Sequence, residues 1–187
     1  MPSSNRKLLE NLSFQSIAEF AGKGLQAIYT IYLANILGAE GMGIYGFANS
    51  IVSYFLLFVG FGIDVYGSRE IATNKNFQNE TVNKIFSLRL VLAVISYICL
   101  IIFVLFFVND LIVQFAILIL GVNIFSNAIL LNWVFQGIER MGIIAIRQVL
   151  VSTFSLILIL LFVHNYDDSL LAFGILAASL FVNSIVM

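Results

Sequence analysis

The chain has 187 residues, of which 61% are hydrophobic and only 10% charged, and its formal net charge at pH 7 is −1. Soluble domains carry roughly 45–50% apolar and about 25% charged residues, so this composition excludes a water-soluble globule and requires a lipid bilayer as the solvent. Without a dense basic run, the sequence gives no indication of nucleic-acid binding.

Six apolar segments are long enough to cross a membrane, since a span needs about 20 residues at a rise of about 1.5 Å each. The connections between them are short, and the longest is the polar stretch at 67–84. The expected fold is therefore all-α, a polytopic transmembrane helix bundle of about six spans. In chain order, the spans are expected at residues 12–37, 43–66, 85–108, 111–133, 143–163 and 170–187.

The first span carries a stripe of polar residues on one helix face. Glu19 and Lys23 are four residues apart, so they share this face and can form an ion pair. Gln26 continues the stripe. Lys23 is expected near the bilayer midplane, where a charge costs on the order of 2.5–3.5 kcal/mol on insertion scales, so the stripe should face protein or water. Two interpretations stay open: an ion pair that only neutralises itself, or the polar wall of a substrate cavity.

The second span repeats this pattern more weakly and ends near Asp64. Arg69 and Glu70 follow in the next connection, so one interpretation of Asp64 is a salt bridge at an inner gate. A carboxylate that simply lies at the membrane interface explains the residue equally well. The third span has few polar residues beyond Arg89 and is expected to face lipid.

In the fifth span, polar residues crowd the first half, from Arg147 to Ser155. Arg147 either extends to the inner interface or projects into a cavity, where a guanidinium group suits an anionic headgroup. The first, second and fifth spans are therefore expected to line a cavity.

Basic residues fall almost entirely on one side of this predicted bundle. Eight of the nine lie in the N-terminus, in the second and fourth connections, or in the span residues beside those connections, and the ninth is Lys23. The other three connections contain no Lys or Arg. The positive-inside rule then places both termini in the cytoplasm and Trp133 at the inner interface of the cell membrane.

Signals for an enzyme are absent. The single histidine, His164, and the single cysteine, Cys99, form no cluster with metal-ligand spacing, and no glycine-rich loop precedes a Lys-Ser or Lys-Thr pair. No metal or cofactor is expected.

Two stretches resemble Wzx-type polysaccharide flippases. Residues 37–72, LGAEGMGIYGFANSIVSYFLLFVGFGIDVYGSREIA, are similar to the family's first hairpin and inner loop. Residues 132–150, NWVFQGIERMGIIAIRQVL, are similar to its fourth inner-loop signature. By position, the inner-loop residues that match the family's Arg-Glu and FQG-x-E motifs, or directly follow them, are Arg69, Glu70, Gln136, Glu139 and Arg140.

The resemblance implies a transporter that moves undecaprenyl-pyrophosphate-linked oligosaccharide repeat units across the cell membrane by alternating access. Such proteins have two pseudo-symmetric lobes, so the chain is expected to be the N-terminal lobe. Its expected partners are the lipid-linked substrate, membrane lipids, a C-terminal lobe and the polysaccharide polymerase machinery. In this interpretation Lys23 and Arg147 suit the pyrophosphate, with Glu19 and Gln26 beside them.

Three rival interpretations remain. The first is a multidrug-type antiporter of the same superfamily, and the second is a membrane-embedded enzyme of polysaccharide assembly. The third is an inactive fragment of a flippase, because the chain ends inside its sixth apolar run.

Overall fold

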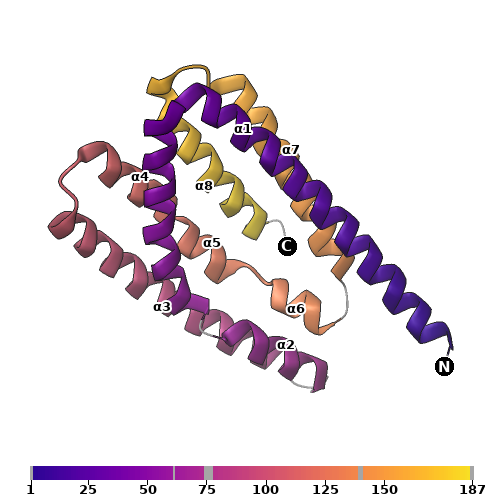
Figure 1. The fold of residues 1–187 in the computed structure, drawn as a ribbon. Coiled ribbons are helices and arrows are strands. Elements are labelled where there is room, and N and C mark those ends of the chain that lie inside the picture. Colours follow the sequence, from indigo (N-terminus) through magenta and orange to yellow (C-terminus); the bar gives the residue numbers. More distant parts are fainter. Residues whose placement is uncertain (1, 61, 74–77, 139–140, 186–187) are drawn as a thin grey trace.

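The computed structural model describes residues 2–60, 62–73, 78–138 and 141–185, and within these ranges all regular secondary structure is helical (Figure 1). The predicted all-α class is confirmed. The helices are α1 (Pro2–Gly60), α2 (Ile63–Thr73), α3 (Gln78–Phe107), α4 (Leu111–Gly121), α5 (Asn123–Ile129), α6 (Asn132–Gly137), α7 (Met141–Phe162), the 3-10 turn η1 (Tyr166–Asp168) and α8 (Ser169–Ile185).

α1 bends sharply at Gly38, where a loop between the first two spans was predicted. Gly38 has φ 65° and ψ −169°, a conformation that is essentially restricted to glycine because glycine has no Cβ. The bend divides α1 into an N-terminal arm, residues 2–37, and a C-terminal arm, residues 39–60. Figure 1 shows the chain turning back at this point. In place of the predicted connection at residues 38–42, the helix continues and bends at the single residue Gly38.

Five helical segments of the described chain are long and apolar enough to cross a membrane, which makes the protein a multi-pass membrane protein. They are Ser16–Thr73, Glu80–Phe107, Leu111–Gly137, Gly142–Phe162 and Tyr166–Ile185. The first contains both arms of α1 and so covers two of the six predicted spans. The exact number and limits of the spans stay a prediction.

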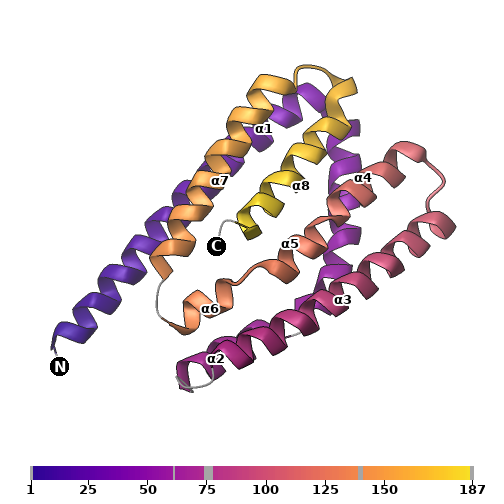
Figure 2. The same ribbon diagram turned by 180° about the vertical axis from the view of Figure 1, so that it is seen from behind.

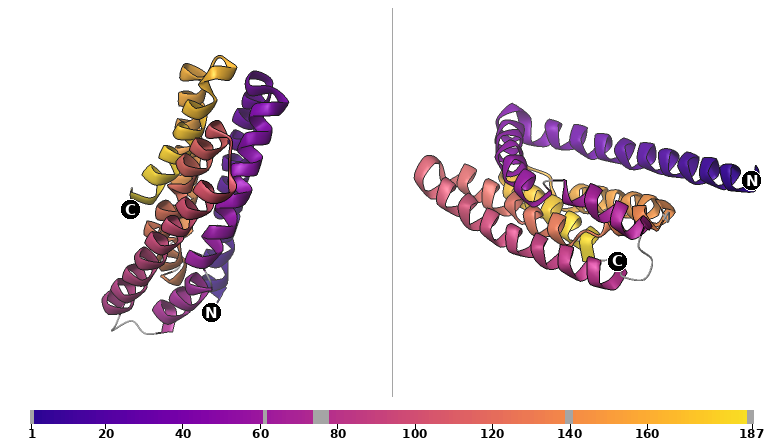
Figure 3. Two further views of the ribbon diagram at one scale, coloured as in Figure 1. Left: turned by 90° about the vertical axis from the view of Figure 1, so that its left-hand side faces the viewer. Right: turned by 90° about the horizontal axis from the view of Figure 1, so that it is seen from below.

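The N-terminal arm of α1 packs along α7, and Figure 2 shows the two helices side by side. Viewed from below in Figure 3, this arm forms one side of the molecule. The apolar core lies between both arms of α1 and helices α3, α4, α5, α7 and α8. Its buried residues include Leu33, Val52, Leu100, Ile117, Ile124, Ile159 and Phe173.

The fourth predicted span, residues 111–133, contains two short helices, α4 and α5, and the first two residues of α6. α4 and α5 are separated at Val122, and α5 and α6 are separated at Leu130 and Leu131. After the second break, α6 packs on α2 in a small separate cluster around Ile71, Ile85 and Trp133. Trp133 is buried in this cluster, where it packs directly against the backbone of Gly67, and its position at the inner membrane interface stays a prediction.

Candidate functional site

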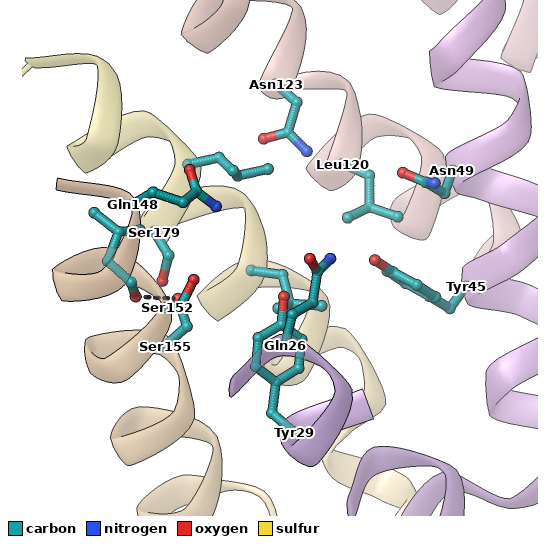
Figure 4. Close-up of a pocket in the computed structure, with 13 residues that line it drawn as sticks. Gln26, Tyr29, Tyr45, Asn49, Leu120, Asn123, Gln148, Ser152, Ser155 and Ser179 are labelled. Atoms are coloured by element: carbon teal, nitrogen blue, oxygen red, sulfur yellow. Dashed lines mark hydrogen bonds between the residues drawn. The ribbon is translucent and has the colours of Figure 1, made fainter. Parts of the chain in front are cut away.

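A pocket lies between both arms of α1 and helices α4, α5, α7 and α8. The pocket holds about 90 Å³, and the empty space reaches about 560 Å³ when its open mouth is included. Figure 4 shows the labelled side chains converging on this space from several helices. We call it the polar pocket. Its lining residues are Gln26, Tyr29, Tyr45, Asn49, Leu120, Asn123, Gln148, Val151, Ser152, Ser155, Leu176, Ser179 and Leu180.

The polar pocket is rich in hydrogen-bonding groups, yet no lining residue in the described chain is charged. Its amides and hydroxyls can both donate and accept hydrogen bonds. Two of the lining residues, Asn123 and Ser179, each have a fully buried side-chain oxygen, Oδ1 and Oγ respectively, without a hydrogen-bond partner among the described residues. Each such atom costs about 1–3 kcal/mol, and a ligand in the pocket recovers that free energy when a change of side-chain rotamer turns the atom toward it.

The predicted stripe of the first span divides between two places. Lys23 Nζ lies 2.8 Å from Glu19 Oε1, which confirms that these side chains can pair, and the two side chains are 70% and 57% exposed. They line a separate surface hollow of about 170 Å³ together with Ser16 and Phe20. Gln26, further along α1, lines the polar pocket.

Arg147 is buried, with 6% of its surface exposed, so it does not extend to open solvent in the described chain. Its Nη2 donates a hydrogen bond to Asn132 Oδ1 at the start of α6. Its Nε and Nη1 have no hydrogen-bond partner among the described residues. The polar pocket is lined by the next residue, Gln148, and by two serines further along α7, but not by Arg147 itself.

Asp64 pairs with Arg89, a partner that the sequence did not indicate. Arg89 Nη1 lies 2.6 Å from Asp64 Oδ1 and also donates to the Leu130 carbonyl at 3.2 Å. Arg89 Nη2 donates to the carbonyl and the side-chain oxygen of Asn127 at 2.7 and 3.0 Å. Arg89 is 1% exposed, and its guanidinium group links α3, on which it lies, to α2, to α5 and to Leu130 directly after α5. In the sequence, the only signal for this partner was the position of an arginine inside an apolar span, because a charge there requires a buried polar partner.

The two inner-loop stretches that resemble a known family pack against each other as α2 and α6. A Cβ at Gly67 would lie 2.5 Å from Trp133 Cε3, and one at Gly137 would lie 2.8 Å from the Ser68 carbonyl. Only glycine permits either approach. The other inner-loop residues are placed differently: Arg69 and Gln136 are exposed and Glu70 is half-buried, while Glu139 and Arg140 lie outside the described residues.

The first, second and fifth predicted spans line the polar pocket, in agreement with the sequence-based expectation. The fourth and sixth spans also line it, through Asn123 and Ser179, and this was not expected. In the described chain α3 contributes no side chain to the pocket, and the exposed residues on its outer face include Val91, Ile95, Ile98 and Phe106.

Comparisons with known proteins point to one family. A family model described as "Polysaccharide biosynthesis protein" matches residues 8–187. A protein of Escherichia coli (strain K12) with the name "Putative O-antigen transporter" is 23% identical over 180 residues, which cover 92% of this chain and 42% of the relative. The chain thus spans less than half the length of that relative. No solved structure matches the chain significantly.

Proposed function

Because the chain belongs to the polysaccharide biosynthesis protein family, we propose that it forms one lobe of a flippase for lipid-linked oligosaccharide. The substrate is an oligosaccharide repeat unit on undecaprenyl pyrophosphate, which moves from the cytoplasmic to the outer leaflet of the cell membrane by alternating access. The function is transport rather than catalysis. The N-terminus lies in the cytoplasm, in keeping with the distribution of Lys and Arg.

The observation that carries this proposal is the buried guanidinium group of Arg147, whose Nε and Nη1 have no partner among the described residues. An unpaired charge is expensive in a membrane interior, and such residues usually mark a substrate path. A guanidinium group matches phosphate oxygens in charge and in geometry. We therefore assign Arg147 to the pyrophosphate, with Lys23 as a second cation and Glu19 as its neutralising partner until substrate arrives.

The packed pair of α2 and α6 supports an inner gate on the cytoplasmic side. Asp64, Arg69 and Glu70 lie on α2 and Gln136 lies on α6, and the close contacts of Gly67 and Gly137 hold these helices together. The helical chain is interrupted at Gly62, before α2, and at Leu130 and Leu131, before α6. Gate opening is a movement of α2 and α6 as one unit, with Glu139 and Arg140 in the connection beyond α6.

A multidrug-type antiporter is the nearest alternative. Antiporters of organic cations need an acidic site, whereas the polar pocket has no carboxylate among its described lining residues. Growth protection against cationic drugs by the full-length protein, without restored surface polysaccharide, would favour that alternative.

The test is complementation of a flippase-null strain by the full-length protein, read as surface polysaccharide at equal membrane abundance. We expect Lys23→Ala and Arg147→Met to lose complementation, and Arg147→Lys to retain part of it because the charge remains. Lys84→Ala is the matched control for Lys23→Ala, since Lys84 also forms an exposed pair with a glutamate four residues away, at 2.6 Å from Glu80. Full complementation by both Lys23→Ala and Arg147→Met contradicts the proposed roles of these cations.

A further inference from the structure

The polar pocket differs in chemistry from the two cations, and this difference indicates a separate ligand group. We propose that the polar pocket binds the hydroxylated edge of a neutral sugar residue, and that it does not bind the pyrophosphate. This inference rests on the proposed function, because it assigns one part of that substrate to one part of the lobe.

The lining favours a neutral ligand over an ion. An anion is best bound by groups that only donate or that carry positive charge, and a hard cation is best bound by carboxylate oxygens. The polar pocket offers neither among its described residues, since its polar groups are tyrosine and serine hydroxyls and asparagine and glutamine amides. Sugar hydroxyls donate and accept at each position, as these side chains do.

Two buried atoms show where hydrogen bonds are missing. Ser179 is 3% exposed, and its Oγ has no partner among the described residues. Asn123 Oδ1, on α5, also has no hydrogen-bond partner among the described residues. Both line the polar pocket, where Figure 4 places them with Gln148, Tyr45 and other polar side chains of the lining. When a change of rotamer turns these oxygens toward the pocket, a ligand with hydroxyl groups supplies a donor to Asn123 Oδ1 and an acceptor or donor to Ser179 Oγ.

Apolar surface accompanies these polar groups. Leu120 and Leu176 are buried and line the pocket, and the rings of Tyr29 and Tyr45 add flat apolar faces. A sugar ring has the same two-sided character, with C–H groups on its faces and hydroxyls at its edge. The volume of about 90 Å³ accommodates an edge of a ring, while the rest of the ring occupies the wider mouth. The pocket is therefore suited to distinguish sugars by the hydroxyls on one edge.

The cations lie next to this pocket along the chain. Gln26 follows Lys23 by three residues, about 4.5 Å along the helix axis, and Gln148 directly follows Arg147. A sugar in the polar pocket and a phosphate group at the cations are thus compatible with a single sugar–phosphate ligand.

The experiment uses the purified full-length protein in lipid nanodiscs and saturation-transfer NMR with millimolar glucose, galactose or N-acetylglucosamine. We expect transfer to at least one of these sugars, and no loss of signal when inorganic pyrophosphate is added. Ser179→Ala and Asn123→Leu should each weaken the binding about 3- to 10-fold, as expected for one hydrogen bond between neutral groups.

Ser184→Ala is the matched control and should bind sugar as the wild type does. Ser184 is also a buried serine of α8, but its hydroxyl donates to the Phe181 carbonyl at 2.7 Å and it does not line the pocket. Thermal unfolding midpoints of all variants show whether a loss of binding reflects a loss of fold, and Ser179→Ala provides the test if Asn123→Leu is destabilised.

Absence of transfer to all three sugars overturns the inference and leaves a pocket filled by water. Competition by inorganic pyrophosphate, or unchanged binding in folded Ser179→Ala, overturns it as well. Complementation of the flippase-null strain separates this result from the proposed function. Complementation without sugar binding contradicts only the pocket assignment, whereas sugar binding without complementation contradicts only the transport function.

Discussion

Arg89 donates hydrogen bonds to four oxygen atoms contributed by Asp64, Asn127 and Leu130. Arg89→Met keeps an unbranched apolar stem and removes all of these bonds. Breaking a fully buried pair costs about 3–5 kcal/mol. We expect a smaller loss, about 2–3 kcal/mol, because the Asp64 side chain is 47% exposed and water can solvate it. The measurement is the thermal unfolding midpoint of the purified protein.

Asp64→Asn is the companion variant, since the amide keeps an oxygen that accepts from Arg89. Its midpoint should fall less than that of Arg89→Met. If the unfolding midpoint of Arg89→Met equals that of the wild type, the guanidinium group does not stabilise the interruption of the helix after α5.

At the scale of single residues, sequence reasoning was reliable only within one helix. The Glu19–Lys23 pair follows from helix geometry alone. The nearest basic residue after Asp64 is Arg69, but five residues along a helix rotate a side chain by about 140°, so the two point to different faces. The true partner, Arg89, lies 25 residues away and is brought close only by the packing of α2 against α3.

At the scale of helices, the contact between α2 and α6 depends on the absence of a side chain at Gly67. In Gly67→Ala the added Cβ would lie 2.5 Å from Trp133 Cε3, so the indole must move within a packed cluster. Overpacking of this kind costs about 1–3 kcal/mol. We expect a lower thermal unfolding midpoint, with partial recovery in the double variant Gly67→Ala, Trp133→Leu. Gly46→Ala is the control, since nothing lies within 4 Å of its added Cβ.

The bend in α1 gives a second helix-scale prediction. Nothing lies within 4 Å of a Cβ added at Gly38, so Gly38→Ala tests backbone conformation without a steric contact. A non-glycine residue in this conformation costs about 1–3 kcal/mol. The unfolding midpoint should fall for Gly38→Ala and not for Gly43→Ala, which also lies in α1 with open space around its added Cβ. Equal midpoints for the two variants would contradict a strained bend.

Helices were predictable from apolar length, but their interruptions were not. No proline marks the interruption at Leu130, whose carbonyl accepts a hydrogen bond from Arg89 of another helix. The bend at Gly38 was predicted as a connection between two apolar spans, and span lengths alone do not distinguish a loop from a bent helix.

At the scale of the whole molecule, the polar pocket was only partly predictable. The polar stripes of three spans indicated it, since several polar residues repeat on one helix face. Asn123 and Ser179 lie in two different apolar runs, and the sequence gives no reason to join them. Their common location follows from the packing of α5 against α8, which only the assembled bundle defines.

The orientation of the bundle in the membrane can be tested by labelling single cysteines. Cys99 is the only cysteine, so Cys99→Ala gives a background without thiols. Four exposed residues then serve as sites, two on each predicted side: Asn109 and His164 outside, Thr73 and Gln136 inside. None of them is Lys or Arg, so the charges that set the orientation are unchanged.

We expect a membrane-impermeant maleimide to label Asn109→Cys and His164→Cys in intact cells, and to label Thr73→Cys and Gln136→Cys only after permeabilisation. The reason is the charge distribution: the connections that carry the first pair contain no Lys or Arg, whereas those that carry the second pair do. The opposite pattern would reverse the orientation and place the α2–α6 gate outside. Labelling of Thr73→Cys and Asn109→Cys from the same side would mean that α3 does not cross the membrane, and the six-span arrangement would then be wrong.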